Sequence, residues 1–221
     1  MATTRKDKTH REEKDHNDAD CSPPTFFEKA QYFVSPLLIL TTLLVDLKYQ
    51  NPYIVVWIFQ VLVPILDYLL PLDRSNLPEG RIKHFEKASS FTAALYFTWA
   101  GDFAVYFCLL YRVSQGLAAQ TPGTFLLYAY SYAQIGAINA GVGHELLHRR
   151  ALVHKVCGTL AFSKMLYSHY FIQHVRSHHK LVATAHDAST GRLNESFYAY
   201  FNRAIVDGVR VSWDYEAKRL A

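Results

Sequence analysis

The chain is poor in cysteine and carries little excess charge, and both shortages limit what it can be. Its three cysteines, Cys21, Cys108 and Cys157, are odd in number and have no CxxC spacing. This argues against a disulfide framework and against a cysteine-ligated metal site. The net charge is only +4, and the excess is scattered over loops. We therefore expect no nucleic-acid partner.

The beginning of the chain almost lacks apolar side chains. Residues 1–20 carry eleven charges of mixed sign and contain no apolar run of the kind that a cleaved signal peptide has. Such a segment cannot bury enough surface to offset the entropy lost on ordering. We predict a disordered charged tail over residues 1–25 and a membrane-embedded domain over residues 26–221.

Four long segments almost lack charge. They are Ala30–Leu47, Pro52–Leu72, Ala88–Tyr111 and Leu117–Gly143. A membrane-spanning helix needs about 20 mainly apolar residues, and each segment is near or above that length. A large buried helical core is the alternative, but four such lengths in 221 residues, with aromatic residues near their ends, favour the membrane. The predicted fold class is an all-α integral membrane helical bundle.

Lysine and arginine are unequally shared between the connecting segments. Six of them lie in the N-terminal part up to Lys29. The connection between the second and third segments adds Arg74, Arg81, Lys83 and Lys87. The other two connections contain Lys48 and Arg112 alone. Because positive loops favour the cytoplasm, we predict a multi-pass protein that starts inside and returns inside near Gly143.

Histidine, in contrast, is abundant over one short region, because eight of the eleven histidines lie between residues 144 and 186. Two ordered boxes stand out, HELLH at residues 144–148 and HVRSHH at residues 174–179. Neutral imidazole is the commonest protein ligand of catalytic transition metals. An α-helix places residues i and i+4 on one face, so we predict one pincer in each box. The predicted metal ligands are His144, His148, His174, His178 and His179.

An intramembrane zinc protease is one alternative, because HELLH also fits the HExxH signature in which a glutamate activates water. Zinc needs three protein ligands and an open position, however, and the second box supplies three imidazoles beyond the first. Two irons held mainly by imidazole suit the chain better. Bound iron activates O2 and so attacks C–H bonds that no side chain attacks unaided. We therefore expect a histidine-rich di-metal site at the cytoplasmic face.

The residues around both boxes resemble those of membrane-bound alkane hydroxylases. NAGVGHELLHR (residues 139–149) resembles the first histidine box of that family and HYFIQHVRSHH (residues 169–179) resembles the second, and the likeness continues through VATAHDAS (182–189) and NES (194–196). The resemblance implies two non-haem iron ions and O2-dependent terminal hydroxylation of alkanes or alkyl chains. It also implies electrons from a rubredoxin-type donor and its reductase. The related xylene monooxygenases keep aromatic methyl groups open as substrates.

Several positions depart from the family pattern. Gln173 stands where the family usually has glutamate, Ser177 where it has glycine, and His186 where it has glutamate. These changes are expected to alter the surroundings of the ligands without removing one. The later histidine boxes of the family are absent from the sequence, so we expect an incomplete family member. The residues expected to support the ligands are Glu145, Arg176 and Asp187.

Two further alternatives stay open at this point. The first is a membrane fatty-acyl desaturase or a sterol hydroxylase-type di-iron enzyme, whose second box is usually one residue shorter than HVRSHH. The second is an inactive truncated membrane protein without a complete metal site. Because five predicted ligands are too few for two iron ions, we expect that the 221-residue chain does not oxidise alkanes.

Overall fold

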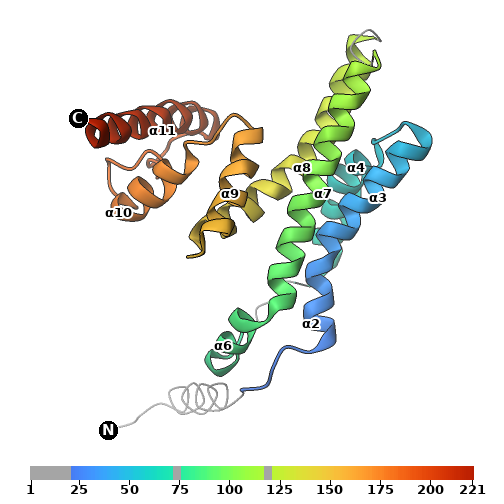
Figure 1. Cartoon of the computed structure of the whole chain (residues 1–221), viewed down its shortest axis with the longest axis horizontal. Helices are drawn as coiled ribbons and strands as arrows, with labels where there is room; N and C mark the ends of the chain where they lie inside the picture. Colours follow the sequence, from blue (N-terminus) through green and yellow to red (C-terminus); the bar gives the residue numbers. More distant parts are fainter. Residues whose placement is uncertain (1–20, 72–75, 117–120) are drawn as a thin grey trace. The chain divides into compact units, whose positions relative to one another are not determined.

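The computed structural model describes residues 21–71, 76–116 and 121–221, and the regular secondary structure of these residues is helical (Figure 1). The predicted tail falls mainly on residues 1–20, outside the described residues. The chain separates after Ile135 into two compact units. Helix α8 (Pro122–His148) runs through the boundary between them.

The first unit is a succession of helices that begins at a capping box. The Thr25 hydroxyl accepts a hydrogen bond from the Glu28 amide, and the Glu28 carboxylate accepts one from the Thr25 amide, which satisfies two amides that have no partner within the helix. The elements are α2 (Phe26–Ala30), the 3₁₀ turn η1 (Gln31–Phe33), α3 (Val34–Tyr49), α4 (Ile54–Trp57), the π-helical turn η2 (Ile58–Leu62), α5 (Val63–Leu69), α6 (Glu79–Lys87) and α7 (Ser89–Ser114).

Within the part of the chain that the structure describes, two helical stretches are long and apolar enough to cross a membrane, Phe26–Tyr49 and Ser89–Ser114. They coincide with the first and third predicted segments. The second predicted segment forms the shorter apolar helix Ile54–Leu69, in which Pro64 lies in the first turn of α5 directly after the π-helical turn. The fourth predicted segment overlaps α8, which is not among the candidate spans of the described residues.

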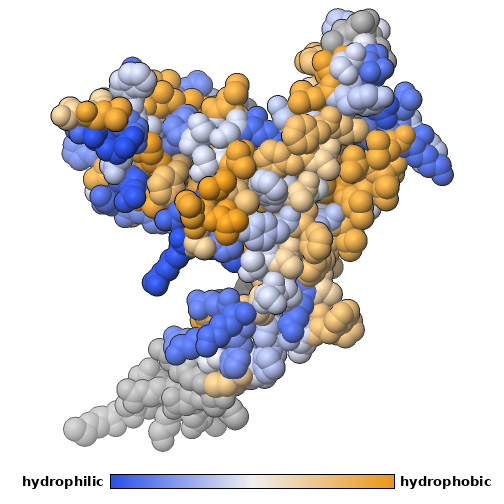
Figure 2. Space-filling model, in the orientation of Figure 1, coloured by the Kyte–Doolittle hydropathy of each residue, from blue (hydrophilic) through white to orange (hydrophobic). Residues whose placement is uncertain are grey.

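The surface of α3 is apolar. Figure 2 shows apolar side chains gathered over the region that α3 occupies in Figure 1. The exposed large apolar residues of this helix include Leu37, Leu40, Leu44 and Leu47. An exposed apolar stripe of this extent suits contact with lipid or with another apolar surface, so the unit has the features of a membrane protein.

Helices α3 and α7 lie side by side and run in the same direction (Figure 1). Near their starts, the rings of Tyr32 and Phe91 have centroids 4.6 Å apart. Near their ends, Nη2 of Arg112 donates to the carbonyl oxygen of Asp46 at 2.9 Å. Because the two helices are parallel, residues 50–88 must return the chain to the end from which it started.

The core of the first unit combines apolar packing with one buried carboxylate. Its apolar residues are Ile39, Val55, Val105, Tyr128, Tyr132 and Ile135. Asp46 is completely buried. Its Oδ2 accepts hydrogen bonds from the Tyr132 hydroxyl at 2.7 Å and the Cys108 thiol at 3.3 Å, and pairs with Nε of Arg112 at 3.5 Å. A charge in such a place requires partners of this kind.

The second unit contains the end of α8 and the elements that carry the histidines. They are α9 (Leu152–Lys164), the π-helical turn η4 (Ile172–His178), α10 (His179–Leu181) and α11 (Phe197–Leu220). The Ser196 hydroxyl caps α11 by accepting a hydrogen bond from the Ala199 amide at 3.3 Å. Loop 182–196 connects α10 to α11 and contains Asp187.

Two glycines allow α8 and α9 to approach at backbone distance. A Cβ atom at Gly158 would lie 2.8 Å from the carbonyl oxygen of Gly143 and 2.9 Å from Cγ of Leu147, so a larger residue would push the helices apart. Leu146 and Leu147 are buried beside this contact. The close packing fixes the last turn of α8, where the first histidine box lies.

Candidate metal centre

The last turn of α8 presents the first pair of histidines. The ring centroids of His144 and His148 are 4.6 Å apart, and their Nε2 atoms are 3.1 Å apart. This is the arrangement that the i, i+4 spacing predicts for an α-helix. Leu146 and Leu147, which lie between them in the sequence, are buried. The turn therefore packs through its leucines and leaves the face that carries the two histidines available for a ligand.

The second box differs from the prediction in its helical geometry. Residues Ile172–His178 form a π-helical turn, in which backbone bonds run from i to i+5. His174 therefore pairs most directly with His179, and their Nε2 atoms are 3.1 Å apart. The predicted pincer of His174 with His178 is not the pair that converges, although these two rings still stack with centroids 5.2 Å apart.

Three imidazole nitrogens, those of His144, His148 and His174, lie within 4.8 Å of one another. Nε2 of His174 lies 2.7 Å from Nε2 of His144 and 3.2 Å from Nε2 of His148. Nε2 of His179 lies 3.1 Å from that of His174, outside this group of three. Two ligands about 2.1 Å from one metal ion, at angles between octahedral and tetrahedral values, would be about 3.0–3.4 Å apart. The nitrogens of the group thus have nearly the spacing of ligands to a shared ion.

The electrostatics of the group favour neutral imidazole. Burial, followed by the neighbouring histidines, lowers the pKa of His174 to about 4. Burial also lowers the pKa of His144 and His179, and the nearby imidazoles add to both effects. A metal competes with protons for these nitrogens, so side chains that stay unprotonated at neutral pH are suited to binding one.

An aromatic stack holds His174 in place. Its ring stacks on Tyr170 with centroids 4.9 Å apart and an interplanar angle of 9°. Tyr170 in turn stacks on Phe162 of α9 at 4.1 Å. Because α9 is anchored to α8, this column connects the second box to the helix that carries the first box.

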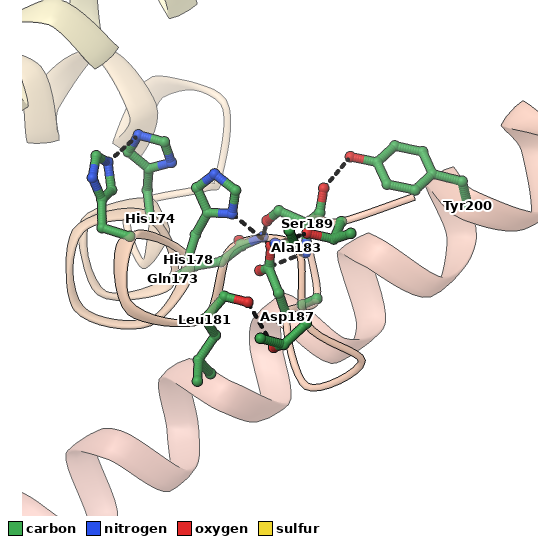
Figure 3. A network of polar contacts seen from close by, with 12 residues as sticks. Gln173, His174, His178, Leu181, Ala183, Asp187, Ser189 and Tyr200 are labelled. Atoms are coloured by element: carbon green, nitrogen blue, oxygen red, sulfur yellow. Dashed lines mark hydrogen bonds and ion pairs between the residues drawn. The ribbon is translucent and has the colours of Figure 1, made fainter. Parts of the chain in front are cut away.

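The imidazole of His178 is held by the carboxylate of Asp187, as Figure 3 shows. Its Nδ1 lies 2.7 Å from Oδ2 of Asp187. Burial raises the pKa of Asp187, but hydrogen bonds from Thr190, from the Ser189 amide and from His178 outweigh burial and lower it. A histidine whose Nδ1 is bound to a carboxylate in this way directs its Nε2 away from that carboxylate. Metal-binding histidines are commonly oriented in this manner.

The other two residues predicted to support the ligands lie elsewhere. Oε1 of Glu145 pairs with Nε of Arg149 at 3.3 Å, and the Glu145 side chain is 52% exposed. The guanidinium of Arg176 lies over the Phe171 ring, 5.6 Å from its centroid. Asp187 contacts His178, whereas the side chains of Glu145 and Arg176 are engaged at the surface.

A mainly apolar cavity of about 630 Å³ adjoins the histidines. His174 and His178 form part of its lining. The rest of its lining comes from Ala140, Phe162, Met165, Tyr167, Tyr170, Gln173, Ser189, Tyr200, Phe201, Ala204 and Ile205. Its size lies within the range of small-molecule sites. The arrangement can hold an apolar molecule beside a metal-binding group.

Gln173 is a structural residue of this site that the sequence pattern marked only as a departure from the family. It is 5% exposed, accepts a hydrogen bond from the Tyr167 hydroxyl at 2.6 Å and donates to the Ser189 hydroxyl at 3.3 Å. A Cβ atom at Gly208 would come within 2.6 Å of its side chain, so α11 packs directly on it. Its position immediately before His174 was the available signal.

Comparison with known proteins finds relatives that share most of this chain. It is 30% identical over 162 residues to alkane 1-monooxygenase 1 of Alcanivorax borkumensis, a match of 72% of this chain and 39% of that protein. It is 27% identical over 159 residues to the alkane 1-monooxygenase of Pseudomonas putida, again 72% and 39%. No protein-family model matches the chain.

The chain spans about two fifths of the length of the curated relatives that it matches. A third relative, the alkane 1-monooxygenase of Acinetobacter baylyi, is 26% identical over 170 residues. Matches to several proteins of one name cover about three quarters of this chain, from which we conclude that it belongs, over this shared part, to the alkane hydroxylase family.

Proposed function

We propose that the chain takes part in the O2-dependent hydroxylation of the terminal carbon of alkanes or alkyl chains at a membrane. The observation that carries the proposal is the position of His174 and His178, which line an apolar cavity while His174 also belongs to the converging imidazole group. An apolar cavity beside a metal site is the arrangement that oxidation of an unfunctionalised chain requires.

Non-haem iron fits the donor set, because imidazole suits iron and the open sites of oxygenases. We assign His144, His148, His174, His178 and His179 as its ligands, and two iron ions as the cofactor that the family implies. When bound, iron supplies the activation of O2. The overall reaction consumes an alkane, O2, two electrons and two protons and yields an alcohol and water, with a rubredoxin-type donor and its reductase as the proposed electron source.

The residues of this chain contribute binding and orientation. The side chains of Phe162, Phe201 and Ile205 provide apolar contact for the alkyl chain and displace water from it. The Asp187 carboxylate keeps the proton of His178 on Nδ1, which leaves Nε2 as a donor. The membrane around the protein is the expected source of an apolar substrate.

A zinc protease is less well supported by the site. In that chemistry the glutamate of HExxH activates a water on the metal, but Glu145 pairs with Arg149 on the outside of the helix. The second box also brings Nε2 of His179 to 3.1 Å from that of His174, beyond the three protein ligands that a zinc site needs.

A narrower cavity should impair use of the substrate. Ala204→Phe would place a ring in the space beside Phe201. The alkyl chain of the substrate would then lose the burial of about three methylene groups at ~0.8 kcal/mol each, which corresponds to a roughly 50-fold lower kcat/KM for dodecane. We would measure 1-dodecanol formed by the chain in lipid nanodiscs with Fe²⁺, rubredoxin and reductase. Ala199→Phe, at an exposed position of the same helix, is the matched control.

For the cavity assignment to hold, Ala204→Phe must keep its metal content and lose turnover. Equal dodecanol formation by the two phenylalanine variants would show that the alkyl chain binds elsewhere. Absence of any 1-alkanol from the iron-loaded wild-type chain, with a working electron supply, would count against the proposed reaction of this chain and would agree with the expectation that five ligands are too few.

The proposed topology predicts which loops are accessible from the cytoplasm. Parallel α3 and α7 support it, because two parallel spans require the intervening chain to cross back. Tags at residues 10 and 80 should therefore be cytoplasmic, and tags near residues 50 and 120 should face the opposite side. Protease accessibility in sealed inside-out vesicles checks this, since the first two tags should be cut. Protection of the tag at residue 80 would refute the arrangement.

A further inference from the structure

The side chain of Arg203, on α11, binds loop 182–196 at several points. Its Nε and Nη2 donate to the two carboxylate oxygens of Glu195, each at 2.7 Å. Its Nη1 donates to the carbonyl oxygen of Ala188 at 3.1 Å, and Nη2 also donates to that of Thr190 at 2.9 Å. The planar fork of a guanidinium suits several acceptors at once, so Arg203 holds this loop against α11.

Arg203 binds the same part of the loop that donates hydrogen bonds to the Asp187 carboxylate. The Thr190 hydroxyl donates to Oδ2 of Asp187 at 2.5 Å, and the Ser189 amide donates to Oδ1 at 3.0 Å. Both carbonyl groups bound by Arg203 thus belong to the three residues that follow this carboxylate. The Tyr200 hydroxyl adds a bond to the carbonyl oxygen of Ser189 at 3.2 Å (Figure 3).

The same carboxylate contacts His178, so the contacts form one continuous path. It runs from the guanidinium of Arg203 through the loop backbone and Thr190 to Oδ2 of Asp187, and from there to Nδ1 of His178 at 2.7 Å. The Arg203–Glu195 pair is well shielded, since its side chains are 15% and 12% exposed. A shielded, multiply bonded pair is more rigid than a single surface ion pair.

We propose that Arg203 is a positioning residue for His178, which it controls through Asp187 without touching the histidine. The inference rests on the proposed metal-binding role of His178 and adds a residue that lies outside both histidine boxes. Groups that orient a metal-binding histidine from behind typically change metal affinity by about 10–100-fold when they are removed. Arg203 is expected to act in this range.

The test uses Co²⁺ as the probe, because its visible spectrum reports ligand geometry apart from any catalysis. The purified full chain in lipid nanodiscs is titrated as wild type, Arg203→Met and Arg210→Met. Arg203→Met should weaken Co²⁺ binding about 10–100-fold and shift the visible bands, with helix content unchanged by circular dichroism. Arg210→Met removes an exposed pair with Asp207 on the same helix and should leave affinity and spectrum unchanged.

A double-mutant cycle separates positioning from general stabilisation. If Arg203 acts through Asp187, then Arg203→Met added to Asp187→Ala should weaken Co²⁺ binding less than about twofold further, because the path is already cut. Independent, multiplying effects would overturn the proposal. If Arg203→Met fails to fold, Thr190→Val decides, because it removes a direct bond to Asp187 without altering α11 and should produce the same spectral shift.

The outcomes distinguish this inference from the proposed function. A wild-type chain that does not bind Co²⁺ would contradict the metal site itself. A wild-type chain that binds Co²⁺, with Arg203→Met or the fallback Thr190→Val equal to it in affinity and spectrum, would contradict the role of Arg203 alone.

Discussion

Replacing His174 with alanine is expected to abolish metal binding by the chain. Its Nε2 is within 3.2 Å of the Nε2 atoms of three other histidines, so the substitution removes the nitrogen that connects the two boxes. Loss of a residue that merely orients a ligand already costs about 10–100-fold in metal affinity, and loss of the ligand should exceed that. Fe²⁺ content after purification and a Co²⁺ titration measure the effect, and alkane hydroxylation should fall with them.

The matched control for this variant is His84→Ala. His84 is exposed on α6, in the first unit, so its removal tests whether loss of any histidine disturbs metal content. We expect His84→Ala to bind metal as the wild type does and His144→Ala to behave like His174→Ala. Wild-type metal content in the His174 variant would show that the converging imidazoles are not the binding site.

Replacing Asp46 with alanine is expected to destabilise the first unit strongly. The substitution leaves the Tyr132 hydroxyl and the Arg112 guanidinium without the carboxylate that they share in the core. Breaking a buried ion pair from one side costs about 3–5 kcal/mol, which corresponds to a fall in the unfolding midpoint on the order of 10 °C for a chain of this size. Thermal unfolding in detergent, followed by circular dichroism, gives the midpoint.

Asp67→Ala provides the comparison, because Asp67 lies exposed on α5. The two substitutions remove the same group from helices of the same unit, and only their burial and partners differ. A midpoint for Asp46→Ala within a few degrees of that for Asp67→Ala would show that the buried carboxylate is not needed for stability.

Local sequence pattern was informative where the relevant contacts are local. The long apolar segments predicted the helices Phe26–Tyr49 and Ser89–Ser114 because length and hydropathy depend on neighbouring residues alone. The spacing of His144 and His148 predicted their pairing because four residues complete one α-helical turn. The family, too, could be named from the two boxes and the residues between and after them.

Tertiary structure decided the features that depend on distant residues or on a departure from regular geometry. The π-helical turn at Ile172–His178 pairs His174 with His179, and no i, i+4 rule anticipates that shift. Asp46 lies near the end of an apolar segment of the sequence, and only the structure shows that Tyr132 and Arg112 contact its carboxylate.

The sequence by itself thus determined the helical class, the histidine boxes and the family of this protein, since each depends on residue type and short spacing. Only the tertiary structure decided which imidazoles converge, that Asp187 anchors His178, and that Arg203 holds loop 182–196, which contains Asp187. The physical reason is that hydrogen bonds and ring contacts depend on the direction in which each side chain points. That direction is set by helix type and packing partners that short sequence spacing does not specify.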